Sequence, residues 1–202
     1  ALLLIRARNY RGGLTEFARI AADAEPPYVR AARLGNQISC LLRLGDVAQA
    51  ASIATTVATD ESLLDCLGED CFTPAISTIA LVRAGDGLGA AAALEMTAEI
   101  SKRAPASRRS AMQWTVARAN MLVASDACKE AAQLLAPVLA HLPPALPSEI
   151  VSIAFETMEY ACRALGQLKQ AAQYQRQREQ FQEARRFGPV FEDTFAAAAA
   201  AA

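Results

Sequence analysis

The sequence LLRLGDVAQAASIA, residues 41–54, decides the fold of this chain. It combines the apolar end of one helix, a tight turn at Gly45 and a second helix with Ala50 at a position for close packing. Glycine can adopt the left-handed conformation that ends a helix, because it has no Cβ to clash. Asp46 can then cap the second helix by accepting hydrogen bonds from its free N–H groups. The stretch therefore predicts an antiparallel helical hairpin.

The same pattern returns further along the chain. Its copies are ALVRAGDGLGAAAALEM (80–96), MLVASDACKEAAQLLAPVL (121–139) and ACRALGQLKQAAQYQ (161–175). The residues at the turn position are 40, 41 and 40 apart, namely Gly45, Gly85, Asp126 and Gly166. A weaker copy opens the chain with Arg8 at the turn position, 37 residues before Gly45. About five repeats are therefore predicted, and no window alternates with period two for long enough to suggest a sheet.

Several of these stretches resemble the tetratricopeptide repeat, whose turn glycine and following alanine are matched by LGDVAQA, AGDGLGA and LGQLKQA. In the first copy, the family's aromatic, small, aromatic and proline positions hold Tyr10, Gly13, Phe17 and Pro26. The resemblance covers about residues 1–180. The aromatic that follows the turn in the family is replaced in the later copies by Val47, Gly87, Cys128 and Leu168. The period here also exceeds the family's ~34 residues.

The resemblance implies an all-α fold, a right-handed superhelix of about five antiparallel helical hairpins. Longer repeats of this kind occur in the sensor halves of large bacterial transcription activators and in segments fused to signalling output domains. Breaks are expected at Pro26-Pro27, at Thr73-Pro74, at Pro105 and in the loop of three prolines that ends at Pro147. Helices are expected at about 1–10, 13–24, 28–44, 47–59, 62–68, 73–84, 87–102, 107–124, 127–141, 148–165 and 168–187.

Two regions are expected along the chain. Residues 1–187 form the helical repeat domain, and residues 188–202 form a C-terminal extension that ends in alanines from Ala196. These alanines are either a natural tract or a substitute for side chains of unknown identity. The polar stretch 173–187 is interpreted as a helix that caps the repeats or as a linker to an output domain. Because the chain has no initial Met and begins within a helical pattern, we expect it to be a piece of a longer protein.

Composition excludes several classes of protein. The chain is 53% hydrophobic, which is enough apolar material to offset the entropy of ordering. A formal net charge of −1 argues against direct contact with nucleic acid. No apolar run approaches the ~20 residues that a membrane-spanning helix needs, so no membrane contact is expected. The five cysteines are scattered and odd in number, which favours the cytoplasm over a secreted disulfide framework.

Catalytic patterns are missing from the sequence. His141 is the one histidine, and no cluster of histidine, cysteine and carboxylate has the spacing of a metal site. The glycines of GDGLG (85–89) follow a helix and lack the lysine of a P-loop, so the repeat turn explains them. Cys66 and Cys71 are interpreted as ordinary thiols, with a disulfide or redox switch as the alternative. We therefore expect no enzyme, no metal and no cofactor.

The resemblance also implies where a partner binds, because in this family the first helix of each hairpin lines the concave face. The polar residues at those positions are Asn36, Ser39, Arg43, Arg83, Gln113, Asn120, Glu156, Tyr160 and Arg163. Asn36 and Asn120 can both donate to and accept from a peptide backbone. Arg43, Arg83 and Arg163 can pair with carboxylates. The alternative is that these are ordinary polar residues on an exposed groove.

These observations predict a non-catalytic module that binds a protein or peptide, within a larger bacterial regulatory or signalling protein. One alternative is a sensor domain that binds a small molecule or signalling peptide and gates a transcription-activating or cyclase output domain. Another is a structural scaffold or oligomerisation module. The segment FGPVFEDTF (187–195) is a candidate for docking in a groove of its own or a neighbouring chain, which would allow self-association. The basic pairs at 102–103 and 108–109 are either a solvated loop or a small contact for an anionic partner.

Overall fold

The computed structural model describes residues 1–6, 8–19, 25–68, 70–142 and 148–187, and within these ranges the chain is all-α, without a strand. The first half contains α1 (Leu2–Arg6), α2 (Tyr10–Ala18), α3 (Pro27–Leu44), α4 (Val47–Thr59), α5 (Glu61–Cys66) and α6 (Phe72–Ala84). The second half contains α7 (Gly87–Arg103), α8 (Arg108–Ala124), α9 (Cys128–Ala140), α10 (Ser148–Ala164) and α11 (Leu168–Phe187). The C-terminal extension 188–202 and the loop 143–147 lie outside the described residues. None of the described helices is both long and apolar enough to cross a membrane.

The turn position predicted from the sequence has the same backbone conformation in all five hairpins. Its φ is 59° at Arg8, 78° at Gly45, 78° at Gly85, 59° at Asp126 and 72° at Gly166. Each value lies in the left-handed region, where a chain can leave one helix and enter the next. The turn prediction is therefore confirmed at each position, although two of the five residues carry a Cβ.

Side-chain caps begin three of the second helices. Asn9 accepts from the N–H of Gly12, Asp46 from that of Gln49 and Asp86 from that of Gly89. The caps predicted at Asp46 and Asp86 are thus confirmed. Each cap satisfies one of the four N–H groups that a helix leaves without a partner in its first turn.

The first hairpin differs from the expected boundaries of 1–10 and 13–24. Its helices are α1 and α2, and Gly12 and Gly13 lie inside α2 rather than between the two helices. The reason is local, because Arg8 turns the chain and Asn9 caps α2 before the glycines are reached. Gly13 is buried, and a Cβ there would come within 3.0 Å of Ile5 Cγ1 in α1. Gly13 therefore allows α1 and α2 to approach closely.

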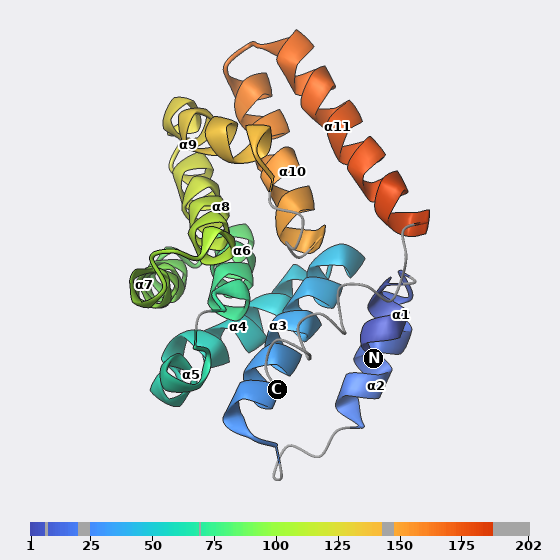
Figure 1. Ribbon diagram of the computed structural model, residues 1–202, viewed down its shortest axis with the longest axis vertical. Coiled ribbons are helices and arrows are strands. Elements are labelled where there is room, and N and C mark those ends of the chain that lie inside the picture. Colours follow the sequence, from blue (N-terminus) through green and yellow to red (C-terminus); the bar gives the residue numbers. More distant parts are fainter. Residues whose placement is uncertain (7, 20–24, 69, 143–147, 188–202) are drawn as a thin grey trace.

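The helices pack in the order in which they follow along the chain (Figure 1). In each hairpin the two helices contact each other: α1 with α2, α3 with α4, α6 with α7, α8 with α9, and α10 with α11. The second helix of each hairpin also contacts the first helix of the next hairpin. The first helices form a further series of contacts, α3 with α6, α6 with α8, and α8 with α10. Every first helix from α3 onward is therefore brought to a common side of the hairpins.

Helix α6 is at the centre of the core. It contacts α3, α4, α7 and α8, and its residues Phe72–Leu81 are all buried. A helix surrounded on all sides needs its polar side chains satisfied within the fold. Thr73 donates to the Ala31 carbonyl oxygen at 3.0 Å, and Ser77 donates to the Thr73 carbonyl oxygen at 2.8 Å. The polar groups of α6 therefore add bonds within and between helices.

The last helix packs along its partner and also contacts the first turn of the chain. The rings of Phe155 in α10 and Phe181 in α11 have centroids 6.2 Å apart, and Gln182 Nε2 donates to Ser152 Oγ at 2.6 Å. The Arg8 guanidinium donates to the Gln182 carbonyl oxygen at 3.0 Å. In Figure 1, α11 accordingly runs from the end of α10 towards α1. Although α11 is mostly polar in sequence, its Tyr174 and Phe181 side chains pack against the core.

Candidate functional site

A cleft of about 180 Å³ opens between three first helices, α3, α6 and α10. Its lining residues are Ser39, Leu42, Arg43, Ile76, Arg83, Glu149, Ile153 and Glu156. Positions 39, 42 and 43 are three and four residues apart, so they share one face of α3. The same spacing unites 149, 153 and 156 on α10. The cleft therefore combines apolar walls with charged groups of both signs.

Four of the residues predicted from the sequence meet in this cleft, namely Ser39, Arg43, Arg83 and Glu156. Arg83 and Glu156 form an ion pair across it, with Nη2 3.0 Å from Oε1. This pair joins α6 to α10, which are separated by a complete hairpin in the sequence. Both side chains are partly exposed, so solvent screens the attraction and the pair contributes little to stability. Its consequence is to fix two charges at one edge of the cleft.

Ser39 is the least exposed polar residue of the cleft, at 3%. Its Oγ has no hydrogen-bond partner within the described part of the chain. A buried hydroxyl without a partner loses the bonds that it would make to water, at a cost of about 1–3 kcal/mol. The hydroxyl of Ser39 therefore lowers the stability of the chain unless another group bonds to it.

Arg43 lies one turn further along α3, on the same face as Ser39. It makes no ion pair or hydrogen bond with any other residue that the structure describes. Its charge still acts on Tyr10 of α2: burial raises the pKa of the Tyr10 hydroxyl, the positive charge of Arg43 lowers it, and Glu149 raises it. Tyr10, Arg43 and Glu149 are thus close enough to influence one another, and the first hairpin borders the cleft.

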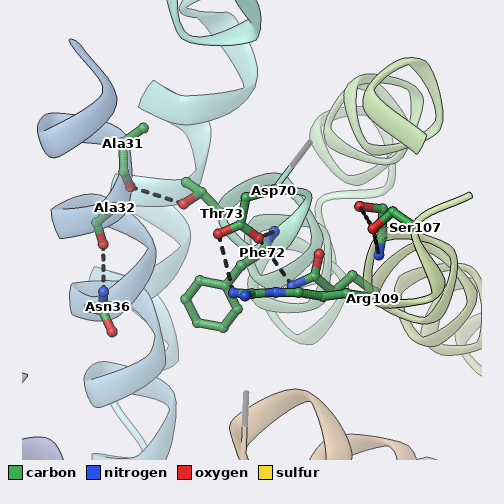
Figure 2. Close-up of polar contacts among 10 residues, drawn as sticks. Ala31, Ala32, Asn36, Asp70, Phe72, Thr73, Ser107 and Arg109 are labelled. Carbon is green, nitrogen blue, oxygen red and sulfur yellow. Dashed lines mark hydrogen bonds and ion pairs between the residues drawn. The ribbon is translucent and has the colours of Figure 1, made fainter. Parts of the chain in front are cut away.

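Three other predicted residues bond within the fold. Asn36 donates to the Ala32 carbonyl oxygen of its own helix at 2.7 Å, as Figure 2 shows. Gln113 is fully buried and donates to Asp70 Oδ1 at 3.2 Å. Asn120, also buried, donates to Thr157 Oγ1 of α10 at 3.0 Å. The contacts of Gln113 and Asn120 arise because α6 and α10 pack against α8, so the predicted face of α8 is covered in this structure.

Tyr160 and Arg163 lie near the end of α10, outside the residues that line the cleft. Tyr160 is 57% exposed. The Arg163 guanidinium pairs with Glu159, one helical turn earlier, at 2.7 Å. These two residues therefore belong to a different part of the surface from Ser39 and Arg43.

Asp70 was not singled out from the sequence, yet it joins several elements (Figure 2). Its Oδ1 accepts from the backbone N–H of Phe72 at 3.0 Å and from Gln113, and its Oδ2 lies 3.4 Å from the Arg109 guanidinium. The turn before α6 is thereby tied to α8. The signal available in the sequence was an aspartate just before a helix, which is typical of a helix N-terminus. Sequence reasoning also missed Glu149 and the apolar walls of the cleft.

The five cysteines are free thiols, so no disulfide joins Cys66 to Cys71. Burial raises the pKa of the Cys71 thiol to about 11, and a hydrogen bond from Ser110 lowers it in part. Burial likewise raises the pKa of Cys40, beside the cleft, to about 11. Because the thiolate is the reactive form, both groups are held in the inert state near neutral pH.

Three of the four basic residues near Pro105 lie beside carboxylates. Lys102 pairs with Glu99 at 2.6 Å, Arg103 lies 3.7 Å from Asp65, and Arg109 pairs with Asp70. These acidic neighbours reduce the positive charge that the stretch presents to an anionic partner. His141 is exposed, with Nδ1 3.3 Å from the Pro137 carbonyl oxygen.

Within the described ranges, no three histidine, cysteine, aspartate or glutamate side chains come together as a metal site would require. Comparison with protein-family models, curated proteins and solved structures finds no match to this chain. The cleft between α3, α6 and α10 is therefore the candidate site, and its function is inferred from its own residues.

Proposed function

We propose that this chain is a non-catalytic, protein- or peptide-binding helical repeat module, in which the cleft between α3, α6 and α10 forms part of the contact surface. The observation that supports this most directly is the meeting of Ser39, Arg43, Arg83 and Glu156 in one cleft. These side chains come from three different hairpins, and they offer hydrogen bonds and charges around an apolar floor. Binding surfaces combine these features, with a few polar groups that fix orientation.

We further propose that the hairpins stack as a right-handed superhelix of the tetratricopeptide type. The repeated left-handed turns and the contacts between successive hairpins support this arrangement. In such a stack each hairpin contacts mainly its neighbours, and the first helices share one face. The period of about 40 residues favours a segment of a bacterial regulatory protein, and the scattered free cysteines favour the cytoplasm.

Ser39 of the cleft is not arranged as an activated nucleophile. A serine nucleophile needs an adjacent general base to take its proton. Ser39 Oγ has no hydrogen-bond partner among the described residues, and so no base in contact. The remaining polar groups of the cleft suit ion pairing and hydrogen bonding.

A second candidate is a sensor domain, and the size of the cleft favours it. A volume of about 180 Å³ holds one side chain or a small molecule, but not an extended peptide. Under the main proposal, the cleft takes one side chain of a partner that also contacts the surrounding surface. Under the second, a free small molecule fills it and biases the position of an output domain.

Selection from a random-peptide display library tests the main proposal. Enriched peptides are synthesised, and their affinity is measured by fluorescence anisotropy for the wild-type chain and for a cleft variant with Arg43→Gln, Arg83→Gln and Glu156→Gln. The matched control is Arg118→Gln, which removes an exposed guanidinium that stacks on Trp114 outside the cleft. We expect saturable binding that weakens at least about tenfold in the cleft variant and is unchanged in the control. Peptides that bind all three proteins equally would contradict the proposal.

A further inference from the structure

Some polar groups of the cleft have hydrogen-bond or ion-pair partners within the chain, and others do not. Arg83 and Glu156 pair with each other, and Glu149 is also engaged in an interaction. Ser39 Oγ and the Arg43 guanidinium have neither a hydrogen bond nor an ion pair with another described residue. These two groups are four residues apart on one face of α3, so both can approach one atom group in the cleft. One is a hydroxyl that can donate, and the other is a cation with several donors.

Ser39 departs from the behaviour of the other buried hydroxyl groups in this chain. Five buried helical hydroxyls donate to the carbonyl oxygen four residues earlier, namely Ser77, Thr78, Thr97, Thr115 and Thr157. Thr73, Ser110 and Ser152 bond to other groups instead. Ser39 makes no such bond to Gly35, although the geometry of a helix offers it. Rotation about its Cα–Cβ bond is enough to direct the hydroxyl to a different acceptor. An acceptor inside the cleft would remove the cost of leaving this group unsatisfied.

The charges of the cleft define the ligand further. The lining carries two arginines and two glutamates, so its formal charge is zero. Arg83 is paired with Glu156, whereas Arg43 has no ion pair among the described residues, so its guanidinium is the cation available to a bound anion. A guanidinium binds a carboxylate through two parallel N–H···O bonds. Glu149 and Glu156 on α10 would repel a dianion such as phosphate more strongly than a single carboxylate.

The apolar walls define the rest of the ligand. Leu42, Ile76 and Ile153 line the cleft beside the polar groups. Ile76 is fully buried, so Leu42 and the edge of Ile153 are the apolar surfaces open to a bound group, and the volume of about 180 Å³ is sufficient for a short stem and its carboxylate. We propose that the cleft is a carboxylate-binding subsite, in which Arg43 and Ser39 bind a carboxylate carried on a short apolar stem. The inference rests on the proposed binding function and names the chemical group that the cleft selects.

Three small probes test this subsite in nuclear magnetic resonance titrations of the full chain. N-acetylglutamate α-amide carries only a side-chain carboxylate, N-acetylalanine carries only a terminal carboxylate, and N-acetylglutamine α-amide is the neutral isostere. We expect saturable shifts at the Ser39 amide and the Arg43 Nε–H with a carboxylate probe, and none with the neutral isostere. Stronger binding of the first probe assigns the site to an acidic side chain, and stronger binding of the second assigns it to a chain terminus.

Two substitutions separate a ligand-binding role from a structural one. Arg43→Gln should weaken binding of the preferred probe at least about tenfold, the loss expected for a charge-assisted pair. Ser39→Ala should weaken it about threefold while raising the melting temperature of the free chain, because it removes an unsatisfied buried hydroxyl. Arg118→Gln, outside the cleft, should leave the affinity for the probe unchanged and should not raise the melting temperature, because it removes only a stacking contact with Trp114. If Ser39 only supported the fold, its replacement by alanine would not combine a higher melting temperature with weaker binding of the probe.

The outcomes distinguish this inference from the proposed function. If neither carboxylate probe binds saturably, or if Arg43→Gln and Ser39→Ala bind as the wild type does, the carboxylate subsite is wrong. Library-selected peptides that still bind at the cleft would then leave the proposed function standing. If instead a carboxylate probe binds in the cleft while no peptide is selected, the subsite stands, and the sensor candidate replaces the peptide-binding one.

Discussion

At the scale of single residues, the turn position shows how one backbone requirement is met by different side chains. Asp126 has φ 59° where Gly45 and Gly85 have φ 78°. A residue with a Cβ is strained in this left-handed region, although aspartate tolerates it better than most. A Cβ built at Gly45 or Gly85 would meet no atom within 4 Å. The cost of replacing either glycine therefore comes from the backbone alone.

This comparison gives a pair of opposite predictions. Asp126→Gly should raise the free energy of unfolding by about 0.5–1 kcal/mol, because it relieves the strained φ. Gly45→Ala should lower it by about 1 kcal/mol, because it introduces the same strain without a steric clash. Urea denaturation of both variants beside the wild type measures the two changes. Changes of the same sign would show that the turns are not equivalent.

The buried thiols predict a loss of stability at alkaline pH. Burial raises the pKa of Cys40 and Cys71 to about 11, above the ~8.5 of an exposed thiol. Between these values the unfolded chain has released the thiol protons while the folded chain still binds them, so raising the pH favours unfolding. Below that window the stabilisation is complete, and it is lost as the pH rises towards 11.

Unfolding free energies near pH 8 and near pH 10.5 test this expectation. The free energy of unfolding of the double variant Cys40→Ala, Cys71→Ala should fall less between the two pH values than that of the wild type. The reason is that the variant has lost the two thiols whose protonation differs between the folded and unfolded states. Comparing each protein with itself cancels the effect of the substitutions on packing. An equal decrease in both proteins would assign the alkaline instability to other groups.

At the scale of elements, α3 and α6 cross at a point where only glycine fits. A Cβ on Gly35 would lie 2.5 Å from Thr73 Oγ1 and 3.2 Å from Thr73 Cα. The backbone atom cannot move aside without shifting α6, which is buried from Phe72 to Leu81. Gly35 is therefore a point of contact between the two helices.

Gly35→Ala should therefore lower the free energy of unfolding by about 1–3 kcal/mol, the usual cost of overpacking a core. Gly87→Ala is the matched control, because Gly87 is also helical and a Cβ there would meet nothing within 4 Å. The control should be neutral or slightly stabilising. Thermal unfolding followed by circular dichroism compares the two. If both variants have the stability of the wild type, α3 and α6 are less tightly packed than the structure indicates.

The elements also show what could be predicted from the sequence. The helices from α3 onward begin and end within a few residues of the expected positions, because glycine, proline and aspartate act locally at their ends. The same local reasoning failed in the first hairpin, where Arg8 replaces a glycine. The burial of the first-helix side chains, in contrast, depends on helices that are distant in the sequence. Gln113 and Asn120 are buried because α6 and α10 pack on α8, which no periodicity in the sequence records.

At the scale of the whole molecule, the first and last hairpins meet. The Arg8 guanidinium bonds to the Gln182 carbonyl oxygen of α11, although the two residues are 174 apart in sequence. The negative charge of Glu149 in α10 also raises the pKa of Tyr10, two residues after Arg8. The first and last hairpins therefore touch at Arg8 and Gln182.

Removing the Arg8 contact should loosen α11 selectively. In Arg8→Gly the backbone strain at φ 59° is relieved, but the bond to α11 is lost. Amide hydrogen exchange should become several-fold faster in the second half of α11, while exchange in α6 should not increase. Arg11→Ala is the control, because Arg11 is a nearby arginine inside α2 and alanine keeps the helix intact. Its exchange in α11 should match that of the wild type. Unchanged exchange in α11 would show that the two ends do not stabilise each other.

The most direct test of the account is the affinity of a library-selected peptide for the wild-type chain and for the cleft variant with Arg43→Gln, Arg83→Gln and Glu156→Gln. The account predicts binding to the wild type that weakens at least about tenfold in the cleft variant, with helicity unchanged in circular dichroism. Equal affinity for the two proteins, or no peptide selected at all, would contradict the claim that this cleft binds a partner.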